Sequence, residues 1–193
     1  SRCWIEVDVR TTQDGAFVLN HDRTLDRCTT GSGPLSDRTL DELRQLSLRS
    51  IDGRQTPHRI GLLEDVLDWA RGRTIVFLDI KEGGDAWEQV LRFVRERGGH
   101  AYCVVLTYSI EDSVRVHRVA PEFVVYGRAT NEAHMRDLLS AGIPRDRLVA
   151  WVHDETPAAV FDRLHKEEIL TTYGVFLEVD RRARTESLGL YHD

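Results

Sequence analysis

The sequence predicts an α/β fold with a parallel sheet, because short apolar strands alternate with amphipathic helices from residue 74 onward. The expected strands are residues 74–80, 101–107, 123–127, 147–152 and 174–179. The expected helices between them are residues 85–97, 110–119, 131–141 and 157–166. Such alternation is typical of βαβ units. The strand at 74–80 is a nearly continuous apolar run, as expected of a strand that is buried on both faces. Since the sequence shows no repeat and no linker, we expect a single domain, residues 1–193.

The chain opens with a strand and a hairpin arm. Residues 3–9 alternate between apolar and polar side chains, with Glu6 and Asp8 on the polar side, as the two-residue period of a strand requires. The Gln-Asp-Gly sequence at 13–15 offers a tight turn into an apolar stretch at 16–19. These patterns predict an antiparallel pair at the start of the sheet.

Several predicted helix ends carry capping residues. Residues 39–42 (Thr-Leu-Asp-Glu) have the form of a capping box and are expected to open a short helix. Asp85 is expected to cap the helix at 85–97, and Gly98 to follow its last turn. Thr156 and Pro157 are expected to start the helix at 157–166, with a cap followed by a proline at the first helical position.

The composition is that of an ordinary globular domain with an acidic balance. The 193 residues include 32 Asp and Glu and 26 Lys and Arg, for a formal charge of −6. The charges are spread along the chain, which argues against nucleic acid as a partner. No run of about 18 apolar residues is present, so no transmembrane segment is expected. Three cysteines without metal-type spacing predict neither a disulfide framework nor a zinc site built on cysteine.

Glu6 and Asp8 are the first candidate site residues. Their carboxylates project from one face of the first strand, and like charges at that spacing repel each other unless a cation neutralises them. An exposed face of an edge strand is the alternative explanation for an isolated Glu-x-Asp sequence.

Asp79 and Lys81 end the buried strand and share one of its faces. In a parallel α/β barrel the carboxyl ends of the strands carry the ligand site, so these two residues, Glu6 and Asp8 are expected to converge there. Three carboxylates suit a hard divalent cation such as Mg²⁺ or Ca²⁺, and a neighbouring lysine suits a phosphate oxygen. The alternative for Asp79 and Lys81 is a strand end that reaches solvent.

His21 follows the hairpin arm and is followed at once by an acid, Asp22. An imidazole, with an unperturbed pKa of about 6.5, can take and give a proton near neutral pH. Near a metal and a phosphate, His21 is therefore a candidate for proton transfer. A surface position is less certain for His153, just past a predicted strand, whereas the remaining histidines are expected at the surface.

A train of motifs lies between Trp4 and Lys81. It begins with Trp4-Ile5-Glu6-Val7-Asp8-Val9-Arg10-Thr11-Thr12-Gln13-Asp14-Gly15 and continues with His21-Asp22-Arg23-Thr24-Leu25-Asp26-Arg27-Cys28-Thr29-Thr30-Gly31-Ser32-Gly33. Later pieces are Thr39-Leu40-Asp41-Glu42-Leu43, Ile60-Gly61-Leu62-Leu63-Glu64-Asp65-Val66-Leu67 and Phe77-Leu78-Asp79-Ile80-Lys81. Together these motifs resemble the glycerophosphodiester phosphodiesterase family. The resemblance is strong over residues 4–81 and rests mostly on the strand and helix rhythm thereafter.

The resemblance implies a TIM-type (β/α)₈ barrel with a small insertion after the hairpin arm, residues 22–58. It implies an enzyme that hydrolyses glycerophosphodiesters, which are small lipid-derived phosphodiesters. The enzyme would use a divalent cation, Mg²⁺ or Ca²⁺. The metal ligands would be Glu6, Asp8 and Asp79, the phosphate-binding residue Lys81, and one of two acid/base histidines His21. In the family picture a glycerol hydroxyl attacks phosphorus and water then opens the cyclic phosphate. Metal charge and the lysine would stabilise the pentacovalent state.

Three features depart from the family pattern. The family's other catalytic histidine lies in a His-Arg-Gly segment on a strand that would precede this chain's first one. Asp79 stands where the family usually has Glu, a side chain about one methylene longer. The usual last strand with its Thr-Asp ending is not recognisable near residues 191–193. We therefore expect a barrel seen without its first strand and without a recognisable last strand, either from a longer chain or from a degenerate family member.

Two further functions stay open at the level of sequence. A non-catalytic or degenerate barrel would bind a phosphate ester or a protein partner without turnover. A doubly wound phosphatase would use a nucleophilic aspartate on its first strand, but its expected pattern is Asp-x-Asp, whereas residues 6–8 read Glu-Val-Asp.

Overall fold

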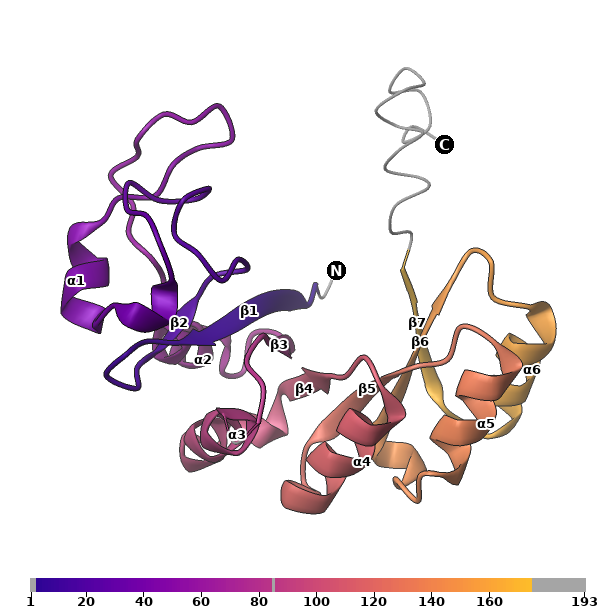
Figure 1. The fold of residues 1–193 in the computed structure, drawn as a ribbon. Helices are drawn as coiled ribbons and strands as arrows, with labels where there is room; N and C mark the ends of the chain where they lie inside the picture. Colours follow the sequence, from indigo (N-terminus) through magenta and orange to yellow (C-terminus); the bar gives the residue numbers. More distant parts are fainter. Residues whose placement is uncertain (1–2, 85, 175–193) are drawn as a thin grey trace. The chain divides into compact units, whose positions relative to one another are not determined.

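The computed structural model describes residues 3–84 and 86–174. The chain divides into two compact units, Ser1–Leu106 and Thr107–Asp193, and the described residues of each include both strands and helices (Figure 1). Among the described residues, no helix combines the length and the apolar character that a membrane crossing requires. The prediction of a single domain stays a prediction.

The first unit is built on a four-stranded sheet in the order β2-β1-β3-β4. Its strands are β1 (Ile5–Thr11), β2 (Phe17–Leu19), β3 (Val76–Ile80) and β4 (Cys103–Leu106). β1 pairs antiparallel with β2 and parallel with β3, and β3 pairs parallel with β4. The predicted hairpin is thus confirmed, and Gly15 takes the left-handed conformation in its turn, with φ of 82°. All five residues of β3 are buried, as its apolar sequence predicts.

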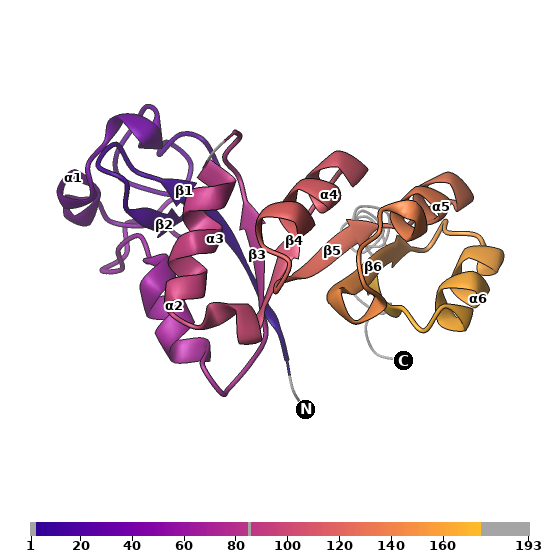
Figure 2. The same ribbon diagram turned by 90° about the horizontal axis from the view of Figure 1, so that it is seen from below.

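Helices of the first unit follow the predicted amphipathic pattern. They are α1 (Leu40–Gln45), α2 (Leu63–Ala70) and α3 (Ala86–Glu96), with 3₁₀ turns η1 (Leu35–Asp37) and η2 (Gly99–Ala101). α2 and α3 lie side by side (Figure 2), and Arg97 Nη2 is 3.4 Å from Glu64 Oε2 between them. Gly98 follows α3 in the left-handed conformation, as predicted. Asp85, the predicted cap of α3, lies outside the described residues.

Apolar side chains of residues 22–58 form a small core together with Val18 of β2. The buried members of this core are Val18, Leu25, Leu35 and Leu43. The predicted capping box opens α1: Thr39 Oγ1 accepts from the Glu42 amide, and Glu42 Oε2 accepts from the Thr39 amide at 2.8 Å. This loop-rich region therefore packs on β2 through its own apolar side chains. Its status as an insertion stays a prediction.

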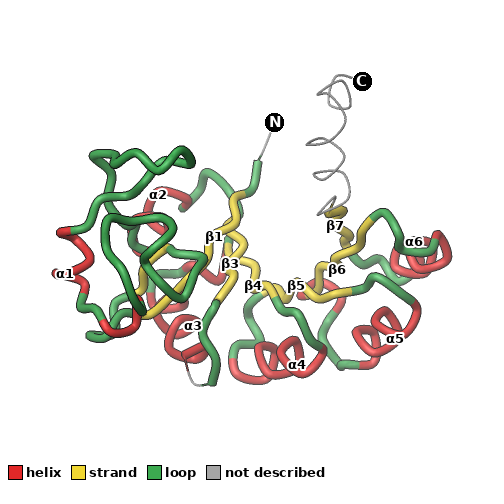
Figure 3. The backbone as a smooth tube through the Cα atoms, turned by 45° about the horizontal axis from the view of Figure 1, so that its top comes forward, coloured by secondary structure: helices red, strands yellow, loops and turns green. Residues whose placement is uncertain are grey.

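The second unit repeats the strand and helix alternation. Its parallel strands are β5 (Val124–Arg128), β6 (Leu148–His153) and β7 (Leu170–Gly174). Its helices are α4 (Ile110–Val119), α5 (Glu132–Ser140) and α6 (Ala158–Lys166), with the 3₁₀ turn η3 (Arg145–Arg147) before β6. The three α-helices cover one face of this unit's sheet (Figure 3). Gly127 of β5 allows this packing, since an added Cβ would meet Leu138 Cδ1 of α5 at 2.5 Å.

The start of α6 and the strand β7 differ from the predictions for the second unit. The predicted cap at Thr156 is wrong, because the N-cap of α6 is Pro157, and the Thr156 hydroxyl instead accepts from the His153 amide at 3.0 Å. The Thr156 hydroxyl, which was expected to cap the helix, is thus hydrogen-bonded in a turn at the end of β6. β7 was not predicted. Of the predicted strand at 174–179, only Gly174 belongs to the described residues, and it is the last residue of β7.

The small core of residues 22–58 gives a first testable prediction. Leu43 is 1% exposed, so Leu43→Ala should lower the free energy of unfolding by about 2 to 5 kcal/mol through lost burial and the cavity left behind. Urea unfolding followed by circular dichroism measures this change. Ile51→Ala, which removes a fully exposed side chain of the same region, is the control. Equal effects of the two substitutions would contradict the packing described.

Candidate functional site

The parallel register of β1 and β3 brings three carboxylates together. Asp8 lies opposite Asp79 in the pairing, and Glu6 shares the face of Asp8 two residues earlier. Ligand oxygens of Glu6, Asp8 and Asp79 all lie within 4.8 Å of one another. Asp79 is buried, Asp8 is half-buried and Glu6 is open to solvent. The structure thus gathers the three predicted metal ligands into one acidic cluster.

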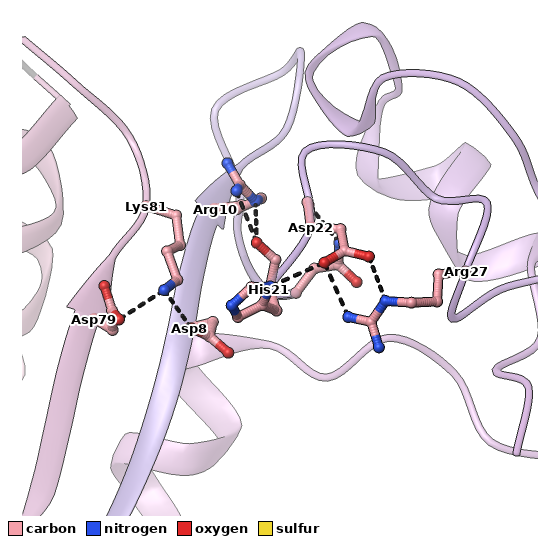
Figure 4. Close-up of polar contacts among 8 residues, drawn as sticks. Asp8, Arg10, His21, Asp22, Arg27, Asp79 and Lys81 are labelled. Atoms are coloured by element: carbon pink, nitrogen blue, oxygen red, sulfur yellow. Dashed lines mark hydrogen bonds and ion pairs between the residues drawn. The ribbon is translucent and has the colours of Figure 1, made fainter. Parts of the chain in front are cut away.

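Lys81 partly neutralises this cluster. Its Nζ lies 2.7 Å from Asp79 Oδ2 and 3.1 Å from Asp8 Oδ1 (Figure 4). Burial acts to lower the pKa of Lys81, but the hydrogen bonds and charges of Asp79 and Asp8 outweigh it, so the pKa of the ammonium is raised. Lys81 therefore stays charged, and it contacts two of the three carboxylates.

The acidic cluster keeps an excess of negative charge. Partial desolvation and then the charges of Asp8 and Asp79 raise the pKa of Glu6, although Lys81 and His21 oppose them. Three carboxylates against one ammonium leave a surplus that a divalent cation would balance. Since carboxylate oxygens are the ligands that Mg²⁺ and Ca²⁺ prefer, the donor set fits either ion.

His21 stands just after β2 and is held next to the cluster. The Asn20 amide donates to the carbonyl of Asp8 at 3.0 Å, and Asn20 Nδ2 donates to the carbonyl of Asp22 at 2.7 Å. Figure 4 shows the imidazole between the carboxylates of β1 and β3 on one side and Asp22 on the other. The His21 side chain is 62% exposed, which leaves it accessible to a ligand.

Asp22 and Arg27 orient the imidazole. Asp22 Oδ1 is 2.9 Å from His21 Nδ1, and Arg27 donates through Nε and Nη2 to the same carboxylate at 2.6 and 2.9 Å. The hydrogen bonds from Arg27 and then His21 hold the pKa of Asp22 far below its usual range. A carboxylate only accepts, so Nδ1 carries the proton in this contact and Nε2 is left to exchange one.

Sequence reasoning missed the contribution of Asp22 and Arg27. The adjacency of His21 and Asp22 was visible in the sequence. Arg27 lies five residues after Asp22, and its contact with that carboxylate depends on the path of the loop.

The other histidines lie away from these contacts or outside the described residues. His153 accepts a hydrogen bond from the Glu155 amide through Nδ1 at 3.0 Å, within its own turn. His58 and His165 are exposed as predicted, whereas the other described histidines, His100, His117 and His134, are half-buried. His192 lies outside the described residues.

Comparisons with known proteins identify the family. Residues 4–145 match the model of the Glycerophosphoryl diester phosphodiesterase family. Rat glycerophosphodiester phosphodiesterase 1 is 49% identical over 92 residues, 46% of this chain and 28% of the rat protein. The glycerophosphodiester phosphodiesterase of Bacillus subtilis is 28% identical over 137 residues, 61% of this chain and 46% of that protein. The chain spans about half the length of the curated relatives it matches.

Solved structures agree with the sequence match. A glycerophosphoryl diester phosphodiesterase from Parabacteroides distasonis is similar with a TM-score of 0.80 and 28% identity, over 89% of this chain and 60% of that one. A phosphodiesterase from Oleispira antarctica, solved with the product sn-glycerol-3-phosphate, gives a TM-score of 0.71 over 96% of this chain and 78% of that one. Its 18% identity shows the fold alone.

These likenesses define an α/β protein of the TIM-barrel class, as the sequence predicted. The chain belongs to the glycerophosphoryl diester phosphodiesterase family, which confirms the resemblance seen in its motifs.

The contacts of Lys81 give a second testable prediction. Lys81→Met removes the ammonium that faces Asp8 and Asp79, so in chelator-treated buffer at neutral pH the free energy of unfolding should fall by about 2 kcal/mol. The loss is smaller than for a fully buried pair because the Lys81 side chain is 20% exposed. Lys166→Met, at the exposed end of α6, is the matched control. Equal stability of the two variants would show that the lysine does not neutralise the cluster.

Proposed function

We propose that the chain carries the metal site and one acid/base group of a metal-dependent phosphodiesterase that hydrolyses glycerophosphodiesters, small lipid-derived phosphodiesters. The observation that supports this most is the cluster of Glu6, Asp8 and Asp79 beside Lys81, inside the segment that matches the family. The glycerophosphodiester names of the relatives supply the substrate class. Charge and geometry support the roles proposed for the individual residues.

Glu6, Asp8 and Asp79 would hold the cation, Mg²⁺ or Ca²⁺. When bound, such an ion supplies positive charge to a phosphoryl oxygen and so favours attack at phosphorus. Lys81 would bind a second phosphoryl oxygen with its ammonium and stabilise charge that develops during the attack. Both roles use the charges that the structure concentrates at β1 and β3.

His21 would move a proton at Nε2. Attack by the neighbouring glycerol hydroxyl needs a base for that hydroxyl and an acid for the departing alcohol oxygen, and His21 supplies one of these two functions. Asp22 keeps the imidazole in the Nδ1-protonated form and stabilises the imidazolium when Nε2 has taken a proton. Because the His21 ring is exposed, a substrate oxygen could approach Nε2 without steric hindrance.

A non-catalytic module that binds a phosphate ester or a protein partner is the second candidate. Asp79, where the family usually has the longer Glu, favours this possibility because the shorter side chain would reach less far toward a bound cation. Calorimetric binding of a glycerophosphodiester with no product formed would support the binding module over the enzyme.

The activity prediction tests the enzyme directly. With glycerophosphocholine and Mg²⁺ or Ca²⁺, the protein should release glycerol 3-phosphate, measured by an enzyme-coupled assay. Glu6→Gln and Asp8→Asn should each lower kcat/KM by about 100-fold or more, since each removes a charged ligand without changing side-chain size. Asp65→Asn, on the exposed side of α2, should leave the rate unchanged. Full turnover by the Glu6 and Asp8 variants would rule out the proposed role of the cluster.

Metal affinity provides a test that does not need turnover. Titration calorimetry with Mg²⁺ and with Ca²⁺ should detect binding to the protein and to Asp79→Glu, which keeps the carboxylate and restores the residue usual in the family. Asp79→Asn should bind at least tenfold more weakly, because a neutral amide replaces a charged ligand. If Asp79→Asn binds as tightly as the unaltered protein, the metal does not occupy the cluster of Glu6, Asp8 and Asp79.

A further inference from the structure

Arg10 is a charged residue of β1 that the proposed chemistry does not use. It follows Glu6 and Asp8 on the same face of the strand, yet it is only 7% exposed. A buried guanidinium is costly unless each of its donors finds an acceptor. Its partners therefore indicate what it does.

The partner of Arg10 is the backbone of His21. Nε and Nη2 both donate to the carbonyl oxygen of His21, at 3.1 and 2.7 Å (Figure 4). Nη1 lies 3.4 Å from Glu82 Oε1, so all three guanidinium nitrogens face an acceptor. The planar fork of an arginine suits such a two-pronged contact, and a lysine would reproduce only one prong.

Glu82 fixes the other side of Arg10. Its Oε1 also lies 3.4 Å from the Thr11 amide, and its own carbonyl accepts from Trp87 Nε1 at 2.9 Å. Trp87 belongs to the buried face of α3. Since Glu82 directly follows Lys81, Arg10 connects the backbone at His21 with the segment that carries the lysine.

Hydrogen bonds now hold three consecutive residues around the histidine. The Asn20 amide is bonded to the carbonyl of Asp8, the carbonyl of His21 to Arg10, and the carbonyl of Asp22 to the Asn20 side chain. The exposed ring itself is bonded to Asp22. Without Arg10 the peptide between His21 and Asp22 would lose its charged donor, and the contact between the two side chains would be free to change.

We propose that Arg10 is a positioning residue for His21: it binds the histidine's carbonyl and so fixes the direction in which Nε2 points. This inference rests on the proposed function of His21 as an acid/base group. Arg10 does not serve as a phosphate ligand, because its guanidinium is buried and its three nitrogens already face acceptors. A loss of Arg10 should therefore affect proton transfer more than substrate binding.

Kinetics of Arg10→Ala and Arg10→Lys test the proposal. Arg10→Ala should lower kcat for glycerophosphocholine by about 10- to 100-fold, the range found for residues that orient a site's ligands, with KM changed less than about threefold. Arg10→Lys keeps the charge and can reproduce one of the two contacts to the carbonyl, so its kcat should lie between those of Arg10→Ala and the unaltered protein. If Arg10→Ala does not fold, Arg10→Lys provides the test. Arg49→Ala is the matched control, because Arg49 also donates to two backbone carbonyls, those of Thr29 and Gly53.

A double substitution shows whether Arg10 acts through His21. In the His21→Ala background, Arg10→Ala should cause no further loss of kcat, because the group it positions is already gone. Additive losses, or losses equal to those of Arg49→Ala, would overturn the proposal.

Nitrogen-15 NMR of the imidazole supplies a readout that does not depend on turnover. The His21 ring should be protonated at Nδ1 in the protein and in Arg49→Ala, and a mixture of tautomers should appear in Arg10→Ala. An unchanged tautomer in Arg10→Ala would refute the positioning role. If His21→Ala retains full activity, the proposed function of His21 fails, while the tautomer measurement still decides whether Arg10 orients the ring.

Discussion

The parallel pairing of β1 with β3 is the constraint on which the candidate site depends. Its register sets Asp8 opposite Asp79 and leaves Glu6 on the same face. Like charges at such short range are unfavourable, and the raised pKa of Glu6 reflects that repulsion together with partial desolvation. The fold retains this arrangement because β3 is buried on both faces and its apolar residues fix the register. The packing of β3 thus holds the acidic cluster in place, and a bound cation would balance its excess negative charge.

The hairpin of β1 and β2 places His21, the proposed proton-transfer group, beside these charges. β2 is short and ends at Leu19, so the chain turns back at the level of Asp8 and presents His21 next to the cluster. Polar contacts then fix the loop: Asp22 and Arg27 act on the ring, and Arg10 acts on the backbone. Arg10, Arg27 and Lys81 each meet an acceptor of the site, and the cluster of Glu6, Asp8 and Asp79 still keeps an excess of negative charge.

Patterns within a few residues of each other made most of the fold predictable. The capping box at Thr39, the turn at Gly15 and the apolar stripe of α3 depend on local spacing, and the structure confirms all three. The alternation of polar residues along β1 also predicted that Glu6 and Asp8 share one face of the strand. Thr156 shows the limit of such reasoning, because a neighbouring turn competed for its hydroxyl. β7 was missed because residues 170–174 lack a clear apolar alternation, with Leu170 and Tyr173 exposed.

Contacts between distant segments were beyond the sequence. Arg10 and Glu82 are 72 residues apart, and nothing in the spacing of either indicates that they meet. Convergence of Asp8 and Asp79 was inferred from fold class, but their direct opposition follows from a strand register that only the structure gives. The supporting residues of a site are harder to predict than its charged ligands, because their partners are often backbone groups that leave no mark in the sequence.

The most direct test is a crystal structure of the protein soaked with Mn²⁺ and glycerol 3-phosphate, with anomalous diffraction used to locate the metal. We expect a manganese peak coordinated by Glu6, Asp8 and Asp79, with a phosphate oxygen on the metal and another on Lys81 Nζ. His21 Nε2 should face an oxygen of the bound ligand. Manganese bound elsewhere with these carboxylates still paired to Lys81, or phosphate bound away from the lysine, would contradict the central claim that this cluster is the metal and phosphate site.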